Sequence, residues 1–362
     1  MTKFAFIIHP LALDDFTRKY SWAQKLPEQL MKKFTKVLPA FKAAHITGIK
    51  SVLGKEIEGY FIACPLTSQQ MMTLPVRKVI KKIIKAGKKA EELGAQVVGL
   101  GAFTSVVGDK GISVADGLKV PVTTGNSYTV ATAVEGTKLA VKKMDYKLEE
   151  EVFTVVGATG SIGRAVSLII AKEVKTLQLV ARDQQKLREL VEEIAAINPG
   201  LAISTSTDLK DIIKRSRIII SASSAVNALI DPDHLLPGTI VCDVARPRDV
   251  AVKIGQQRDD VLVIEGGIVE VPGSVNFNLD FGYPPGTSYA CMAETMMLAL
   301  ENRFEDYSLG SEIELDKVEE TIQFAQKHGF KLAGLRSFER ALSDHEIEQI
   351  KERARENFLA SC

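Results

Sequence analysis

The chain has 362 residues, of which 46 are lysine or arginine and 45 are aspartate or glutamate, so its formal net charge is +1. This balance excludes a general nucleic-acid binder, which carries a basic excess, and no apolar run reaches the ~20 residues that a membrane helix needs. The opening apolar segment is too short for a signal peptide, and Cys64, Cys242, Cys291 and Cys362 form no CxxC pair. We therefore expect a cytoplasmic protein with reduced thiols, no membrane span and no nucleic-acid partner, long enough for two domains.

An α/β pattern occupies the first 150 residues. Prolines 27, 39 and 65 act as breakers in the loop-rich stretch that follows the first strand, and charged residues 147–151 mark a boundary. The predicted elements are a strand at 4–9, an amphipathic helix at 76–93 with one apolar face, a strand at 95–100 leading into loop 101–105, and a helix that opens at loop 123–129 and ends near residue 144. We expect an N-terminal α/β substrate domain over residues 1–150.

From residue 152 short strands alternate with helices. The predicted strands are Val152–Val156, Thr176–Val180, Ile218–Ser221, 239–243 and 261–264, with helices notably at 163–172 and Gln184–Ile197. Such alternation indicates a doubly wound parallel sheet. We expect this domain to span residues 151–287, and we expect a mostly helical C-terminal segment over residues 288–362.

A glycine-rich loop joins the first of these strands to the first helix. Residues 157–163 read Gly-Ala-Thr-Gly-Ser-Ile-Gly, a GxxGxxG spacing. Glycines permit the tight turn, and the amides at the helix start bind a pyrophosphate with help from the helix dipole. The strand–loop–helix context favours a Rossmann dinucleotide site over a purely structural turn. The predicted cofactor-binding residues here are Gly157, Thr159, Gly160, Ser161, Ile162 and Gly163.

The end of the second strand indicates which dinucleotide is bound. Arg182 stands about 20 residues beyond the last glycine, where an acidic residue would hold the ribose of NAD. Arginine there favours a 2′-phosphate, with Lys186 as a second cation, so NADP(H) is expected. Asp183 keeps NAD possible, although it also sits where a helix N-cap is needed.

Two further loops stand at strand carboxyl ends, where such folds bind ligands. Ala222 and Ser223 could line the adenosine side of the site. Gly267 and Val269, in the Glu-Gly-Gly-Ile-Val run that follows the last strand, could bring backbone close to the nicotinamide. Either loop could equally be an ordinary turn.

Cys291 begins an apolar helix just after the proline–glycine loop 282–286. The helix dipole can lower the pKa of a thiol at that position and so favour the nucleophilic thiolate. Taken alone, a cysteine with apolar neighbours is more often buried and inert.

Several segments together resemble the long-chain fatty acyl–acyl-carrier-protein reductases of cyanobacteria and their bacterial relatives. These segments are residues 61–66, 99–105, 123–126, 157–163, 181–182, 265–270 and 289–294. The resemblance implies reduction of an acyl thioester to an aldehyde with NADPH, and it places the acyl-accepting cysteine of the family's Ala-Cys-x-Ala-Glu motif at Cys291. The first 60 residues match loosely, loop 282–286 differs, and the tail after residue 331 extends beyond the usual end.

Within this resemblance, Thr104, Ser105 and Asn126 are candidate donors to the negative oxygen of the reacting carbonyl, or polar residues that cap their own loops. His9 could move a proton or serve as a structural hydrogen-bonder. Lysines of helix 76–93 could attract an acyl carrier protein or the phosphates of coenzyme A, or form a solvated face. The sequence favours neither thioester partner and no oligomeric state, and no carboxylate cluster calls for a metal.

Two rival hypotheses use the same cofactor domain. A shikimate- or amino-acid-type NADP-dependent dehydrogenase would work without covalent catalysis, but the N-terminal half offers no convincing Lys–Asp pair to handle a hydroxyl proton. A non-catalytic NADP sensor would need the glycine loop and Arg182 but would not need Cys291.

Overall fold

A computed structural model describes residues 1–10, 27–223, 229–245, 248–250, 254–280 and 282–361. The chain forms two compact units. The first contains residues 1–126, 271–311 and 321–331, and the second contains residues 127–270, 312–320 and 332–362. The sequence predicts three consecutive segments, divided near residues 150 and 287. Each of the two observed units instead combines segments that are far apart in the sequence.

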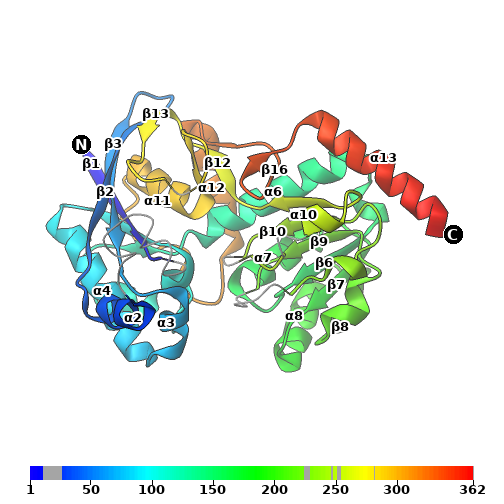
Figure 1. The fold of residues 1–362 in the computed structure, drawn as a ribbon, viewed down its shortest axis with the longest axis horizontal. Coiled ribbons are helices and arrows are strands. Elements are labelled where there is room, and N and C mark those ends of the chain that lie inside the picture. Colours follow the sequence, from blue (N-terminus) through cyan, green and yellow to red (C-terminus); the bar gives the residue numbers. More distant parts are fainter. Residues whose placement is uncertain (11–26, 224–228, 246–247, 251–253, 281, 362) are drawn as a thin grey trace. The chain divides into compact units, whose positions relative to one another are not determined.

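The first unit is built on a six-stranded mixed sheet with the order β13-β2-β3-β1-β4-β5 (Figure 1). β1 runs parallel to β3 and β4, β4 runs parallel to β5, and β2 is antiparallel to both β3 and β13. The strands are β1 Thr2–Ile8, β2 Phe41–Lys50, β3 Glu56–Ala63, β4 Val97–Leu100, β5 Val122–Thr123 and β13 Gly273–Asn276. Strand β14, Thr287–Tyr289, also belongs to the unit.

Helices cover both faces of this sheet. Ala5 and Ile7 of β1 pack with the buried face of helix α4 (Val76–Glu92). Phe6 points to the other face of the sheet, where it lies beside Gly99 of β4 and Thr295 of helix α11 (Ala290–Glu301). This alternation is the period-2 pattern of a strand that is buried on both sides. The helices are α2 Glu28–Val37, α3 Ser68–Thr73, α4 Val76–Glu92, α5 Ile112–Ala115 and α11 Ala290–Glu301, with a 3₁₀ turn at Ala102–Ser105.

In the second unit a six-stranded parallel sheet has the order β11-β10-β9-β6-β7-β8. Numbered from β6, this is the order 3-2-1-4-5-6 of the Rossmann fold, which reverses direction between β6 and β9. Its strands are β6 Val152–Val156, β7 Thr176–Val180, β8 Ala202–Ser206, β9 Ile218–Ser221, β10 Ile240–Asp243 and β11 Leu262–Glu265. The α/β class and the parallel Rossmann sheet expected from the sequence are confirmed.

The remaining elements of the second unit include the helices that flank this sheet (Figure 1). Its helices are α6 Asn126–Lys143, α7 Ser161–Ile170, α8 Gln184–Ile197, α9 Leu209–Ile213, α10 Ile254–Gln257 and α13 Asp344–Ser361, with 3₁₀ turns at Leu148–Glu150 and Pro232–His234. Its short strands are β12 Ile268–Glu270, β16 Arg336–Ser337 and β17 Arg340–Ala341, the last two forming a hairpin. Asn126 opens α6 from the first unit, and α12 Leu315–His328 and β15 Lys331–Leu332 contain residues of both units.

The expectation of a loop-rich stretch after the first strand is wrong, because α2, β2 and β3 lie there. The three prolines bound these elements: Pro27 caps α2, Pro39 precedes β2 and Pro65 follows β3. β2 was not predicted, because polar residues interrupt its apolar pattern and its buried residues do not alternate regularly with exposed ones. The mostly helical tail also contains an unexpected hairpin, β16–β17.

Candidate active site

The glycine loop of the second unit has the geometry of a phosphate-binding turn. Gly157 adopts φ +78°, and Gly160 is the N-cap of α7. The amides of Gly157 and Ala158 donate to the carbonyl of Val180, at 2.8 and 3.0 Å, which fixes the loop against the end of β7. The first amides of a helix have no acceptor within that helix, so those of Ile162 and Gly163 are available in principle to an anion.

Two of the glycines are required by close backbone approaches. A Cβ on Gly163 would lie 2.2 Å from the carbonyl oxygen of Gly157, and a Cβ on Gly157 would lie 2.8 Å from the carbonyl oxygen of Ala222. Side chains at these positions would therefore push the loop, α7 and residues 222–223 apart. This cradle fits a dinucleotide, whose pyrophosphate needs the backbone to come close.

Arg182 and Asp183, which follow β7, carry the two charges that bear on the choice between NAD and NADP. The Asp183 carboxylate accepts hydrogen bonds from the amides of Gln185 and Lys186, at 3.0 and 3.2 Å, and so caps α8. Arg182 is exposed, and no residue in the described part of the chain pairs with it. Lys186 is also exposed, one turn further along.

The loop after β9 lies directly beside the glycine loop. The amide of Ala222 donates to the carbonyl of Val156, and the backbone of Ala222 and Ser223, which follow Ser221 at the end of β9, lies against Gly157. Two aspartates stabilise these loops. Asp249, six residues beyond the end of β10, accepts hydrogen bonds from both serines, and Asp243, at the end of β10, accepts them from the amides of Ala245 and Val250. Sequence reasoning assigned no functional role to either aspartate.

The loop after β11 offers backbone groups only. Gly267 is buried with φ +92°, and the side chain of Val269 is fully buried in β12. A Cβ on the neighbouring Gly266 would lie 2.9 Å from the sulfur of Cys242. Any contact of Gly267 or Val269 with a cofactor would therefore have to use the main chain.

Cys291 is the second residue of α11 in the first unit and is partly exposed. Gly125, with φ +73°, packs directly on it, since a Cβ there would lie 2.3 Å from both the Cα and the Cβ of Cys291. The next residue, Asn126, opens α6 and is partly exposed. The structure therefore brings Cys291 and the segment that contains Asn126 together.

A buried carboxylate connects α11 to this same segment. Glu294 is fully buried, and its Oε1 accepts hydrogen bonds from the hydroxyls of Thr123 (2.5 Å) and Ser308 (2.9 Å). Thr123 Oγ1 in turn accepts from the amide of Gly125 at 3.1 Å. Sequence reasoning noted Glu294 only as part of a motif. Its partner Thr123 is 171 residues away, so no local signal could reveal the contact.

His9 follows β1 and lies against the turn that contains Thr104 and Ser105. The amide of Phe103 donates to His9 Nε2 at 3.0 Å, so this nitrogen is unprotonated and Nδ1–H donates to the carbonyl of Pro10, also at 3.0 Å. His9 is therefore neutral here, with hydrogen bonds at both ring nitrogens.

The side chains of Thr104 and Ser105 form hydrogen bonds within their own turn. Their hydroxyls donate to the carbonyls of Gly101 and Ala102, each at 2.7 Å, and both side chains are buried. Ala102 adopts φ +47°, a left-handed conformation that persists only where the surroundings impose it. These bonds fit the loop-capping interpretation of the two hydroxyls.

These residues share one edge of the sheet in the first unit. α11 runs antiparallel to β1, because Thr2 at the start of β1 donates to Asn302 just after the helix, whereas Cys291 lies at its beginning. Cys291 therefore faces the carboxyl end of the parallel strands. His9, the turn at 102–105 and Asn126 follow β1, β4 and β5 at that same end.

The other described cysteines differ from Cys291. Cys64 is fully buried, and burial raises the pKa of its thiol to about 11. Cys242 is buried inside β10. Cys362 lies outside the described residues. Among the described cysteines, Cys291 alone is not fully buried.

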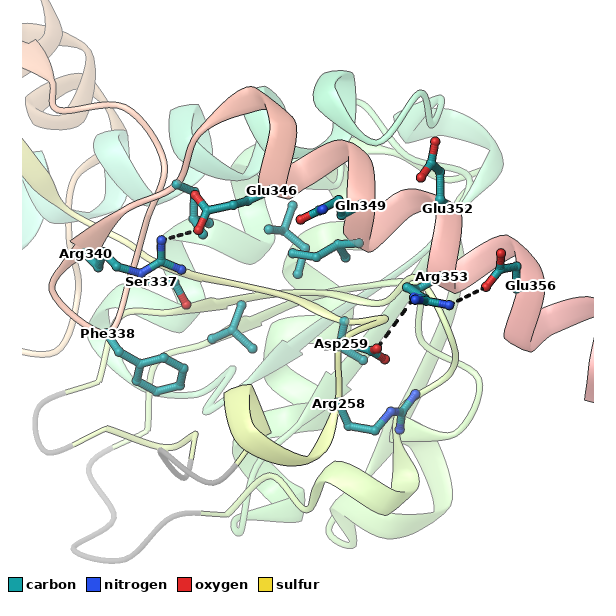
Figure 2. A pocket seen from close by; sticks show the side chains of 15 residues that line it. Arg258, Asp259, Ser337, Phe338, Arg340, Glu346, Gln349, Glu352, Arg353 and Glu356 are labelled. Atoms are coloured by element: carbon teal, nitrogen blue, oxygen red, sulfur yellow. Dashed lines mark hydrogen bonds and ion pairs between the residues drawn. The ribbon is translucent and has the colours of Figure 1, made fainter.

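A pocket of about 760 Å³ lies elsewhere in the second unit, between α13, the β16–β17 hairpin and β11. Figure 2 shows three ion pairs among its charged side chains, Arg340 with Glu346 and Arg353 with Asp259 and Glu356. None of its lining residues belongs to the residues that the sequence proposes for cofactor binding or catalysis. No helix among the described residues is long and apolar enough to cross a membrane.

Comparisons with known proteins match the chain to two kinds of oxidoreductase and to an aminotransferase. The family model of shikimate / quinate 5-dehydrogenases matches residues 138–265. The long-chain acyl-[acyl-carrier-protein] reductase of Synechococcus elongatus is 27% identical over 78% of this chain and 85% of its own length. The aminotransferase PigE of a Serratia species is 31% identical over 96% of this chain, and the chain spans 42% of that protein's length.

Among solved structures, L-tryptophan dehydrogenase from Nostoc punctiforme aligns over 98% of this chain and 89% of its own, with 12% identity and a TM-score of 0.40. The family-model match and the likeness to the acyl-carrier-protein reductase agree with the strand order of the second unit, which is a Rossmann domain of the kind found in NAD(P)-dependent oxidoreductases.

Proposed function

We propose that this protein reduces a fatty acyl thioester to an aldehyde with NADPH, through a covalent acyl intermediate on Cys291. The observation that carries the proposal is the setting of Cys291. It is partly exposed at the start of α11, against Gly125, in a chain similar over most of its length to an acyl-carrier-protein reductase. A helix N-terminus favours the thiolate over the thiol, as a nucleophile requires.

The proposed reaction has two steps. The Cys291 thiolate attacks the thioester carbonyl, and the C–S bond to the carrier breaks, so that the carrier thiolate leaves and takes a proton from solvent. NADPH, when bound, supplies the hydride that reduces the acyl-cysteine carbon. The resulting hemithioacetal on Cys291 collapses to the aldehyde and regenerates the thiolate. Both steps develop negative charge on the carbonyl oxygen, which nearby donors must stabilise.

We propose Asn126 and the first amides of α11 as these donors, because Gly125 holds the Asn126 segment against Cys291. Thr104 and Ser105 already donate to backbone carbonyls. We therefore propose that they and His9 shape the turn at 102–105 and do not contact the reacting oxygen.

For the cofactor, the residues of the second unit fit NADP(H). The loop from Gly157 to Gly163 would hold the pyrophosphate, and Arg182 with Lys186 would bind the 2′-phosphate. Asp183 is occupied as the cap of α8, which leaves its carboxylate poorly placed to hold a ribose. The loop at Ala222 and Ser223 would border the cofactor beside the glycine loop.

For the thioester partner, the basic surface of the first unit fits an acidic acyl carrier protein or the phosphates of coenzyme A. Residues 27–92 contain 13 lysines and arginines against five acidic residues, in a chain whose net charge is +1. Lys81, Lys85 and Lys88 are exposed along α4, opposite the face that packs on the sheet. Such a surface raises the rate at which an acidic partner associates.

The alternative is a dehydrogenase that uses no covalent intermediate, favoured by the match of residues 138–265 to shikimate / quinate 5-dehydrogenases. The two functions differ in their need for the thiol. The purified protein should oxidise NADPH and release aldehyde when given a fatty acyl thioester. Cys291→Ala should abolish this turnover yet bind NADPH with unchanged affinity. Turnover of the Cys291→Ala variant at the wild-type rate would instead support the alternative.

A further inference from the structure

Asp249 is a fully buried carboxylate in the second unit, and it holds the loop beside the glycine turn. Its Oδ2 accepts hydrogen bonds from Ser221 Oγ at 2.7 Å and from the amide of Ser223 at 3.0 Å. Its Oδ1 accepts one from Ser223 Oγ at 2.5 Å. Three donors from one short loop thus converge on one side chain.

This loop forms a wall of the cofactor cradle. Ser221 ends β9, and the carbonyl of Ala222 is the group that a Cβ on Gly157 would strike at 2.8 Å. Residues 222 and 223 therefore lie in close contact with the turn at Gly157. In sheets with this strand order, the dinucleotide lies at the carboxyl ends of β6 and β9, which are the two strands that these residues follow.

The segment that contains Asp249 is itself fixed. Asp243, at the end of β10, accepts hydrogen bonds from the amides of Ala245 and Val250, both at 3.0 Å. The carbonyl of Asp249 accepts from the amides of Leu229 and Ile230, at 2.8 and 3.1 Å. Asp249 is thus held from several sides and presents its carboxylate to the β9 loop in one orientation.

We propose that Asp249 is a positioning residue for the dinucleotide: it sets NADPH affinity through the loop 221–223 without touching the cofactor. The proposal rests on the cofactor site proposed above. Removal of the carboxylate would leave its donors in the loop without an acceptor, which costs free energy. The loop 221–223 should therefore move from its position beside Gly157.

The test measures NADPH binding to the protein alone, by quenching or enhancement of cofactor fluorescence, together with the thermal midpoint of each variant. Asp249→Ala should raise the Kd for NADPH about tenfold. Asp249→Asn should stay within about threefold of wild type, because its amide oxygen can replace Oδ2 and its NH₂ can donate to Ser223 Oγ.

Asp260 offers a matched control in the same unit. It is equally buried and accepts hydrogen bonds from Arg258 and Asn357, but it precedes β11 at the other end of the sheet. Asp260→Ala should lower the thermal midpoint as Asp249→Ala does, yet leave the Kd for NADPH unchanged.

If Asp249→Ala does not fold, Ser221→Ala provides the test, since it deletes one buried donor to the same carboxylate and should raise the Kd severalfold. An unchanged Kd in Asp249→Ala, or in Ser221→Ala when it stands in, overturns the proposal, as do equal Kd changes in Asp249→Ala and Asp260→Ala. A wild-type protein that does not bind NADPH overturns the cofactor site as well. Acylation of Cys291 should be normal in all variants, which keeps a failure of this inference distinct from a failure of the thioester chemistry.

Discussion

At the scale of single residues, the neighbours Arg182 and Asp183 have separate tasks at the end of β7. The carboxylate of Asp183 accepts hydrogen bonds from two amides at the start of α8, whereas the side chain of Arg182 is exposed. A cation in this position is what a 2′-phosphate requires. The local hydrogen bonds of the acidic residue thus support NADP(H) over NAD.

Replacement of Arg182 by alanine should raise the KM for NADPH about tenfold, because a charge-assisted hydrogen bond contributes about 1.5–3 kcal/mol. The KM for NADH should change little, since NADH lacks the 2′-phosphate. Arg188→Ala on the exposed side of α8 is the matched control and should affect neither cofactor. Equal losses with both cofactors would argue against a 2′-phosphate contact.

At the scale of elements, α4 presents an apolar face to the sheet and a lysine-rich face to solvent. Val79, Ile83 and Ala86 are fully buried, and Lys81 and Lys85 on the opposite side are exposed. The packing accounts for the apolar face, and the proposed acidic partner would account for the concentration of charge on the other.

Charge reversal of Lys81, Lys85 and Lys88 to glutamate should raise the KM for a carrier-bound acyl thioester about fivefold or more at low salt, and the effect should shrink at high salt. The KM for a short, neutral synthetic thioester should stay constant. The same charge change at Lys172, Lys175 and Lys214, exposed in the second unit, is the control. Identical effects of the α4 variant on both substrates would remove the docking surface from the account.

The elements that were predicted correctly have a strong local pattern of residue types in the sequence. β6, β7 and β9 were predicted at their observed bounds, because runs such as Val152–Val156 are apolar and rich in β-branched residues. β8 was missed, since its residues Ala202–Ser206 are mostly polar and belong to an exposed edge. The glycine loop was predicted because glycines at this spacing, between a strand and a helix, are typical of a tight turn that opens the helix.

The contacts of the candidate site could not be predicted in the same way. Asp249 meets Ser221 across 28 residues, and Glu294 meets Thr123 across 171. The hydrogen-bond partners of both carboxylates are close to them only in the folded chain. Glycine spacing indicates Gly157, and the resemblance to a family motif indicates Cys291, but neither identifies the side chains that hold the loops around them.

At the scale of the whole molecule, the chain returns to its first unit after completing the Rossmann sheet. Residues 271–311 supply α11, which contains Cys291, and residues 321–331 supply His328. His328 is fully buried: its Nδ1 and the hydroxyl of Ser51 are 2.8 Å apart, and its Nε2 lies 2.5 Å from Glu301. This cluster joins segments that are 277 residues apart in the sequence.

The stability of the first unit should fall as the pH drops from about 7 to about 5. Burial lowers the pKa of His328 despite the raising effect of Glu301, with Lys327 and Lys55 also lowering it. The unfolded chain, with a histidine pKa of about 6.5, therefore takes up the proton first, and stability is lost as the pH falls below that value. For Glu301, burial raises the pKa, but hydrogen bonds with Lys327 and His328 outweigh it and leave the pKa lowered, so its contribution is lost only in more acidic solution.

Urea unfolding monitored at several pH values tests this dependence. His328→Gln should be less stable than wild type at pH 7 and should show a flatter decline of the midpoint towards pH 5. His345→Gln, at an exposed position of α13, is the control and should keep the wild-type slope. A decline in His328→Gln as steep as that of wild type would mean that another group is responsible.

The measurement that tests the central claim most directly is transfer of a radiolabelled acyl group from a thioester to the protein in the absence of NADPH. The account predicts stoichiometric label on the peptide that contains Cys291, none in Cys291→Ala, and release of the label as aldehyde when NADPH is added. A wild-type protein that reduces the thioester with NADPH yet never carries the label on Cys291 would contradict it.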